Sequence, residues 1–138
     1  MVRMTIDYVG GLRCRAVHGP SKTELATDAP TDNRGRGESF SPTDLVATAL
    51  ATCLLTTMAM RAEDAGLSLD GATATVEKIM SAEPPRRIAR LVVDVQLPLP
   101  RSADPEGRLE HAGRNCPVAL SLAAELEQVI TFRWKDEG

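Results

Sequence analysis

The length, composition and charge of the chain are those of one ordinary globular domain. Its 138 residues, 43% of them hydrophobic, are enough to bury a core without disulfides or metals, and we expect a single domain over residues 1–138. A formal net charge of −3 lacks the basic excess of nucleic-acid-binding proteins, which excludes that class of partner. The first residues do not form a secretory signal, and no apolar run approaches the roughly eighteen residues that span a bilayer. We therefore expect a cytoplasmic protein that makes no membrane contact.

Residues 5–27 predict extended structure. We expect two extended stretches that pair as a hairpin, with residues 23–26 following a Gly-Pro-Ser turn that begins at Gly19. Arg13 and Arg15 alternate with less polar residues, so both face the same side of a strand. The next stretch, TDAPTDNRGRGESF, is dense in Asp, Asn, Gly and Pro and predicts a surface loop.

The strongest helix signal in the chain begins at Ser41. Ser41 is a typical N-cap, Pro42 suits the first helical position, and Asp44 can bind free backbone N–H groups of the first turn. The helix should run to about Ala65 and stop at Gly66. Its body, LVATALATCLLTTMAM, is apolar or small nearly all round. We therefore expect burial on most faces, in the core of one chain or in a core shared with a second subunit.

The second half of the chain predicts two strands, two short helices and a last strand. ATATVEKIM and IARLVVDVQL alternate and are β-branched, and we expect them to pair antiparallel across the polar turn EPPRR. Residues 104–112 predict a helix begun by Ser102 or Asp104 and broken near Gly113, and Asn115-Cys116-Pro117 starts another into VALSLAAEL. VITFRW predicts a terminal strand. Because the repeated strand–helix–strand order of a doubly wound sheet is absent, we expect an α+β fold.

Three cysteines make thiol chemistry the first question, because thiols in a reducing compartment are catalytic, redox-sensing or inert core residues. Cys53 lies in the apolar helix, where burial raises a thiol pKa and a plain core role is the simplest interpretation. Cys116 lies at a predicted helix N-terminus, which lowers a thiol pKa, although a capping role is equally open. Cys14 lies between two arginines, and we expect it to be an ordinary strand residue.

The chain carries no motif for a metal or an organic cofactor. It has no CxxC or HxxxH, and His18 and His111 lie far apart in sequence, so we expect no metal site. GxSxG, GxGxxG and P-loop motifs are also absent, which excludes the corresponding hydrolase, nucleotide-cofactor and phosphoryl-transfer classes. We expect no cofactor.

Two sequence motifs resemble those of the OsmC/Ohr family of osmotically induced and organic hydroperoxide resistance proteins. They are SPTDLVATALATC, which ends at Cys53, and NCPV, which contains Cys116. The resemblance covers essentially the whole chain, and the loop before the helix and the turn EPPRRI resemble an OsmC-like branch. It implies an intertwined, strand-swapped homodimer in which antiparallel sheets wrap around central helices, with active sites at the dimer interface.

The same resemblance implies a role for each cysteine. Cys53 would be the peroxidatic thiol that forms a sulfenic acid, and Cys116 the resolving thiol that closes a disulfide, recycled by a small or lipoyl dithiol. Because attack requires a thiolate, a nearby cation is needed, and the family places an arginine of the first strands there. This residue corresponds to Arg13 or Arg15, and we favour Arg15. The two arguments disagree about which thiol attacks. The family resemblance makes Cys53 the attacking thiol, whereas the predicted helix N-terminus favours a thiolate at Cys116.

The family pairs this arginine with a glutamate near the start of the central helix, and this chain has none there. Asp44, Thr43 and the loop residue Glu38 are the alternatives. Asp44 precedes Cys53 by nine positions, which at about 100° per residue places the two on opposite helix faces. Capping is the simpler role for Asp44, and Glu38, on a loop, is the other possible partner.

Three functions are consistent with these features. The first is a peroxidase that prefers organic hydroperoxides because apolar residues line its pocket, such as Leu54, Leu55, Met58 and Leu120. The second is a non-enzymatic dimer that binds a small apolar ligand or senses oxidants through the same cysteines, and the missing glutamate favours it. The third is a pair of core thiols without chemistry.

Overall fold

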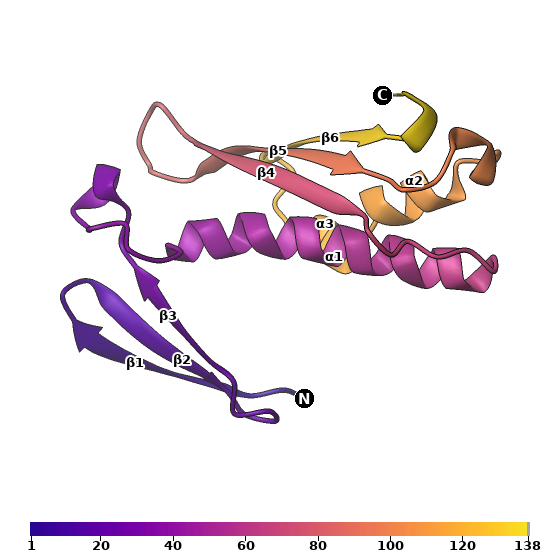
Figure 1. Ribbon diagram of the computed structural model, residues 1–138. Helices are drawn as coiled ribbons and strands as arrows, with labels where there is room; N and C mark the ends of the chain where they lie inside the picture. Colours follow the sequence, from indigo (N-terminus) through magenta and orange to yellow (C-terminus); the bar gives the residue numbers. More distant parts are fainter. Residues whose placement is uncertain (138) are drawn as a thin grey trace. The chain divides into compact units, whose positions relative to one another are not determined.

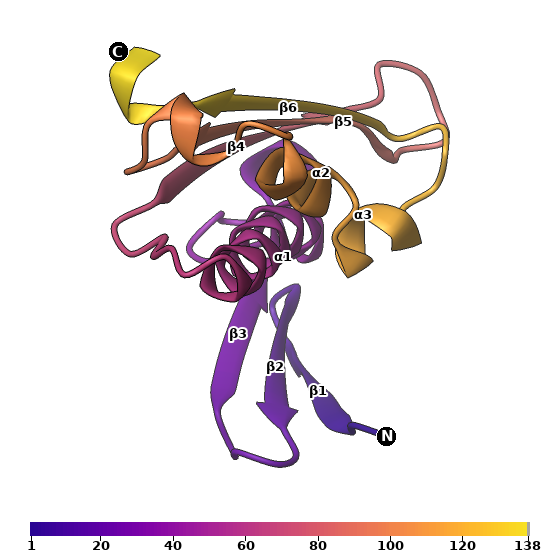
Figure 2. The same cartoon turned by 90° about the vertical axis from the view of Figure 1, so that its right-hand side faces the viewer.

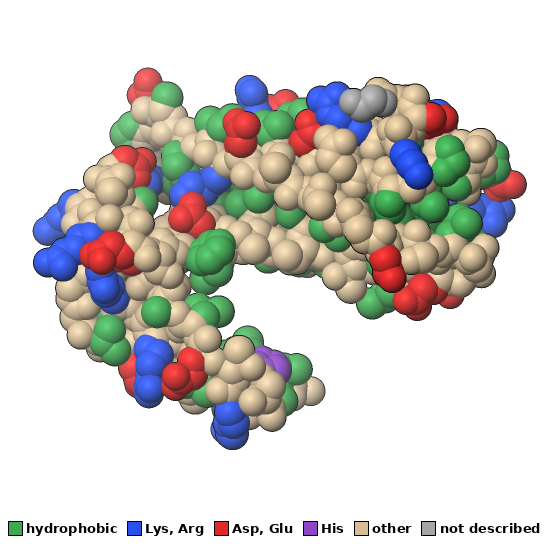
Figure 3. All heavy atoms as spheres, in the orientation of Figure 1, with side chains coloured by type: hydrophobic (Ala, Val, Ile, Leu, Met, Phe, Trp, Pro, Cys, Tyr) green, Lys and Arg blue, Asp and Glu red, His purple; other side chains and the backbone are tan. Residues whose placement is uncertain are grey.

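The computed structural model describes residues 1–137, and Figure 1 shows its elements. The chain divides into two compact units, Met1–Val46 and Ala47–Gly138. That the two units form one domain stays a prediction. On the face shown in Figure 3, acidic and basic side chains are interspersed.

The first unit contains a three-stranded antiparallel sheet. Its strands are β1 (Met4–Gly10), β2 (Arg13–His18) and β3 (Glu24–Asp28), in the order β1-β2-β3. The prediction of two extended stretches was therefore wrong by one strand. Gly10 and Gly11 adopt φ of 88° and 63°, which turns the chain back on itself between β1 and β2. The turn after His18 is confirmed, since the Lys22 N–H donates to the His18 carbonyl at 2.8 Å.

The segment between β3 and the long helix is a loop, as predicted, with one short 3₁₀ turn, η1 (Thr31–Asn33). It folds back on the end of β3, where the Gly37 N–H donates to the Ala29 carbonyl at 3.1 Å. Gly35 lies so close that a Cβ there would come within 1.7 Å of the Ala29 oxygen. Only glycine allows this approach, which brings residue 38 next to the end of β3.

Helix α1 (Pro42–Asp64) has the predicted start and end. Ser41 and Asp44 cap its N-terminus, and Gly66 ends it with φ of 73°. One stripe of the helix is buried: Ala47, Leu50, Ala51, Leu54, Met58 and Ala62. Burial on most faces is therefore not achieved within one chain, because Thr52, Thr56 and Met60 are exposed.

The hydropathy of α1 corrects one expectation from the sequence. By length and composition alone the helix could cross a membrane, with a mean hydropathy of 1.5 over its best window. The expectation that no apolar run approaches this length was wrong, because the threonines interrupt the apolar sequence without lowering its mean hydropathy far. A buried core helix passes the same test, and a third of that window is buried inside the chain.

The second unit contains a mixed sheet of β4 (Thr73–Met80), β5 (Ile88–Gln96) and β6 (Glu127–Arg133). β4 and β5 pair antiparallel as predicted, but β6 runs parallel to β5, so the sheet is not wholly antiparallel. The parallel pairing arises because the intervening helices carry the chain back to the start of β5. Figures 1 and 2 show α1 and two short helices, α2 (Arg108–Arg114) and α3 (Pro117–Ser121), on one face of this sheet. The core lies between these layers.

The two short helices differ in extent from their predictions. α2 (Arg108–Arg114) starts late, because the Asp104 carboxylate accepts the Leu109 N–H at 3.1 Å from outside the helix. It also continues through Gly113. α3 (Pro117–Ser121) ends early, and the Ala119 carbonyl accepts a hydrogen bond from the Gln128 side chain at 3.1 Å instead of a helical N–H. Two single 3₁₀ turns, η2 (Arg101–Ala103) and η3 (Lys135–Glu137), complete the elements.

Candidate functional site

Cys53 lies on α1 beside the buried stripe. Its helical neighbours Leu50 and Leu54 are completely buried, while Cys53 itself is half-buried. Its Sγ lies 4.0 Å from the Thr57 Oγ1, within reach of a weak hydrogen bond. Cys53 is a free thiol. It therefore sits at the border of the core, where a reagent can approach it.

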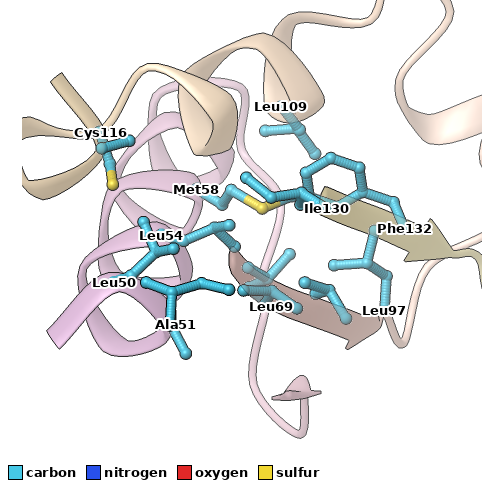
Figure 4. Packing of buried hydrophobic residues seen from close by; sticks show 14 of the residues in the cluster. Leu50, Ala51, Leu54, Met58, Leu69, Leu97, Leu109, Cys116, Ile130 and Phe132 are labelled. Carbon is cyan, nitrogen blue, oxygen red and sulfur yellow. The ribbon is translucent and has the colours of Figure 1, made fainter. Parts of the chain in front are cut away.

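Cys116 is the N-cap residue of α3 and is completely buried. It belongs to the same apolar cluster as Leu50 and Leu54 of α1, and Figure 4 shows it at the edge of that cluster. Gly113 permits this packing, because a Cβ there would lie 2.9 Å from the Met58 sulfur. The close approach of α2 to α1 thus sets Cys116 against the central helix.

The two thiols are neighbours that influence each other. Burial raises the pKa of Cys116, and the nearby Cys53 thiol raises it further, whereas the backbone N–H groups of Ala119 and Val118 lower it. The prediction that the helix N-terminus acidifies Cys116 was wrong, because removal from water outweighs two favourable N–H groups of a helix only five residues long. The structure brings the predicted pair together, and their catalytic roles stay predictions.

Arg13 lies in the first unit between two carboxylates. Its Nη2 is 2.5 Å from Glu38 Oε1 and 3.4 Å from Asp28 Oδ2. Arg36 also approaches Glu38, at 3.9 Å. Glu38, one of the acids proposed as an arginine partner from the sequence, is therefore bound to Arg13.

Arg15 has different partners on the same face of the sheet. It contacts Glu24 at 3.0 Å and Asp7 at 3.6 Å, and all three side chains are more than half exposed. Solvent screening makes such pairs weak. The contacts thus distinguish two arginines that the sequence could not, and the preference for Arg15 as the catalytic cation stays a prediction.

Asp44 has the structural role that its position predicts. Its Oδ2 accepts the Ser41 N–H at 2.9 Å, and the neighbouring Thr43 hydroxyl lies 3.2 Å from the Ser41 hydroxyl. Cys14 is half-buried on β2, opposite Tyr8 of β1. The hydrogen bonds with Ser41 therefore give Asp44 a role in capping α1.

Asp28 is a site residue that sequence reasoning missed. It is 1% exposed, and its Oδ2 accepts the Glu38 N–H at 2.9 Å as well as contacting Arg13. In the structure Asp28 pairs directly with Arg13 in the β2–β3 register, which the sequence alone does not give. The turn-rich composition after Thr27 concealed it, because an aspartate there suggests a solvated turn.

The apolar residues expected to line a hydroperoxide pocket differ widely in their exposure. Leu54 and Met58 are completely buried in the core, Leu55 is half-buried and Leu120 is 69% exposed. A groove of about 330 Å³ lies instead at the C-terminal end of α1, lined by Arg61, Asp64, Arg108 and neighbouring residues. No cysteine is among the described residues that line it. In the described part of the chain, no three His, Cys, Asp or Glu side chains cluster in a way that could hold a metal ion.

Comparisons with known proteins agree with the resemblance seen in the motifs. The family described as OsmC-like protein matches residues 35–130. A comparison with curated proteins gave no match. A solved structure of a candidate osmotic stress induced and detoxification response protein from Psychrobacter arcticus 273-4 is 37% identical and covers 96% of each chain, with a TM-score of 0.88.

More distant structures share the fold. An organic hydroperoxide resistance protein OsmC from Legionella pneumophila is 16% identical, with 96% of each chain covered and a TM-score of 0.74. The organic hydroperoxide resistance protein OhrB of Bacillus subtilis is 15% identical, with 96% of this chain and 98% of that chain covered and a TM-score of 0.70. The α+β arrangement of two small sheets and helices is thus that of the OsmC and Ohr structures. Since the family match and the Psychrobacter relative each span most of its length, the chain belongs to the OsmC-like protein family.

Proposed function

We propose that this protein is a thiol-dependent peroxidase that reduces organic hydroperoxides in the cytoplasm. The observation that supports this most directly is the pairing of a reachable thiol, Cys53, with a buried neighbouring thiol, Cys116, whose pKa is raised. A thiol that keeps its proton is a poor first nucleophile and suits a resolving role. The names of two structural neighbours, organic hydroperoxide resistance proteins, agree with this class of substrate.

The proposed reaction has three steps. The Cys53 thiolate attacks the terminal oxygen of the hydroperoxide, the O–O bond breaks, and the alkoxide takes up a proton and leaves as an alcohol. Cys116 then attacks the Cys53 sulfenic acid, which releases water and forms a disulfide. A small or lipoyl dithiol reduces this disulfide and is itself oxidised to a cyclic disulfide.

For the cation that the proposed reaction requires, we choose Arg13 in place of Arg15, the residue favoured from the sequence. Two carboxylates fix its guanidinium, one of them on a buried side chain, whereas Arg15 has exposed partners only. A fixed guanidinium stabilises a thiolate better than a mobile one, because it is not free to turn away. Replacing Arg13 with Gln should lower the peroxidase rate on the order of 10²-fold. Arg15→Gln, on the same strand face, is the matched control and should have little effect.

A second copy of the chain is part of this proposal. The face of the first sheet that carries Met4, Ile6, Tyr8 and Leu25 is apolar, yet these side chains are 46% to 67% exposed. Apolar faces of this kind normally mark an interface. A strand-swapped homodimer, as the family resemblance implies, would cover it.

The first experiment is to treat the reduced protein with one equivalent of cumene hydroperoxide and to map disulfide-linked peptides by mass spectrometry. We expect a Cys53–Cys116 disulfide that is absent from Cys53→Ser. In Cys116→Ser we expect a Cys53 sulfenic acid that dimedone traps. Thiols that stay reduced in the native protein would contradict the peroxidase.

A non-enzymatic dimer that senses oxidants is the alternative, and the absence of a glutamate near the start of α1 favours it. Turnover separates the two functions. A peroxidase consumes many equivalents of hydroperoxide when dihydrolipoamide is supplied, whereas a sensor forms one disulfide per chain and stops.

A further inference from the structure

Asp28 is a buried carboxylate that the proposed reaction does not use directly. It is 1% exposed, and its carboxylate contacts other described residues through Oδ2: the Glu38 N–H donates to Oδ2 at 2.9 Å and Arg13 Nη2 lies 3.4 Å away. Oδ1 is also buried, and no described residue forms a hydrogen bond with it. A buried carboxylate oxygen without a partner is unfavourable, so stability alone does not explain an aspartate at this position.

The position of Asp28 connects the two members of the arginine–glutamate pair. One oxygen contacts the Arg13 side chain and the Glu38 backbone together, and Glu38 in turn contacts the same guanidinium nitrogen. The backbone adds a further link, because the Asp28 N–H donates to the Phe40 carbonyl at 3.1 Å. Asp28, at the end of β3, therefore contacts both the Arg13 side chain and the loop that carries Glu38.

We propose that Asp28 is a positioning residue that fixes the Arg13 guanidinium against Glu38. The inference rests on the proposed function insofar as Arg13 is the cation that acts on the peroxidatic thiol. Arg15, the other arginine of β2, supports this inference by comparison. Arg15 has two exposed acidic partners and no buried one, so its side chain can exchange partners with water.

Asp28→Asn tests the inference, because Asn keeps the size of the side chain and an oxygen that can accept the Glu38 N–H but removes the charge. Asp7→Asn is the matched control, since it removes an exposed carboxylate from the same sheet face. We expect Asp28→Asn to lower kcat/KM for cumene hydroperoxide on the order of 10- to 100-fold, with Asp7→Asn unchanged. A decrease that is confined to the stability of the variant, with kcat/KM intact, overturns the inference.

A measurement on the unmodified protein keeps the test independent of both folding and activity. Rotation of each guanidinium group can be followed by NMR, and we expect slow rotation for Arg13 and fast rotation for Arg15. Equal, fast rotation of both overturns the inference even if the peroxidase is confirmed. Conversely, slow Arg13 rotation that speeds up in Asp28→Asn supports the positioning role even if the wild-type protein reduces no hydroperoxide, a result that would contradict the proposed function alone.

Discussion

Ser41 and Asp44 cap each other at the start of α1. The Ser41 N–H donates to Asp44 Oδ2 at 2.9 Å, and the Asp44 N–H donates to Ser41 Oγ at 3.1 Å. This reciprocal pair satisfies a backbone donor on each residue, as a capping box does, with Asp in place of the usual Glu or Gln. The helix that carries Cys53 is therefore fixed at its first turn by two side chains.

Ser41→Ala should lower the free energy of unfolding by about 1 kcal/mol, because the Asp44 N–H loses its acceptor at a buried position. Urea denaturation followed by circular dichroism measures this. Thr56→Ala, at an exposed position of the same helix, serves as the control and should change stability little.

Asp44→Asn should leave the proposed peroxidase rate of the folded protein unchanged, and a large fall in kcat would show that Asp44 has a catalytic role.

Gly113→Ala should destabilise the protein although alanine favours helices. The added methyl would lie 2.9 Å from the Met58 sulfur and 3.3 Å from Leu54 Cγ, both on buried side chains. Overpacking of this kind outweighs the gain of about 1 kcal/mol in helix propensity, and we expect a net loss of about 1 kcal/mol. Ala112→Gly, one residue earlier at a half-buried position, is the comparison for helix propensity. A stability gain in Gly113→Ala would show that α1 and α2 are less closely packed.

Local signals predicted those elements whose ends depend on nearby residues. Ser41, Asp44 and Gly66 define α1 within the chain segment itself, and alternation alone located β4 and β5. Elements that depend on distant partners were less accurate. The parallel direction of β6 and the early end of α3, where Gln128 binds the Ala119 carbonyl, result from tertiary packing that no local pattern contains.

The candidate site shows the same division. Cys53 and Cys116 were found from their motifs, because the family resemblance fixes both positions. The pKa of Cys116 was predicted in the wrong direction, since a helix N-terminus is visible in the sequence and burial is not. Asp28 was missed because its burial depends on the pairing of β2 with β3 and on the loop that folds over it.

The raised pKa of Cys116 predicts a loss of stability in alkaline solution. The folded protein keeps this thiol proton at pH values where the unfolded chain has released it. The resulting stabilisation is complete below the ordinary thiol pKa of about 8.5 and is lost as the pH rises through the higher folded value. Urea denaturation between about pH 7 and 10 should therefore show a declining free energy of unfolding, with a smaller decline in Cys116→Ala. Equal slopes for both proteins would contradict the burial of a protonated thiol.

The exposed apolar face of the first sheet predicts association of two chains. Ile6 is 62% exposed and pairs with Ala16, which in turn pairs with Leu25, so the three side chains share one face. Burying an isoleucine contributes about 2 kcal/mol, and a dimer would contain two such positions. Ile6→Lys should therefore raise the dissociation constant at least on the order of 10²-fold and yield monomers at micromolar concentration in light scattering.

Thr5→Lys tests whether that effect depends on the face and not on the added charge. Thr5 is exposed on the same strand, but its side chain points to the opposite side of the sheet because neighbouring strand residues alternate. This variant should remain dimeric. Equal dissociation of both variants would indicate that charge repulsion alone separates the chains. A monomeric wild-type protein would mean that the apolar face of β1–β3 is covered by something other than a second copy.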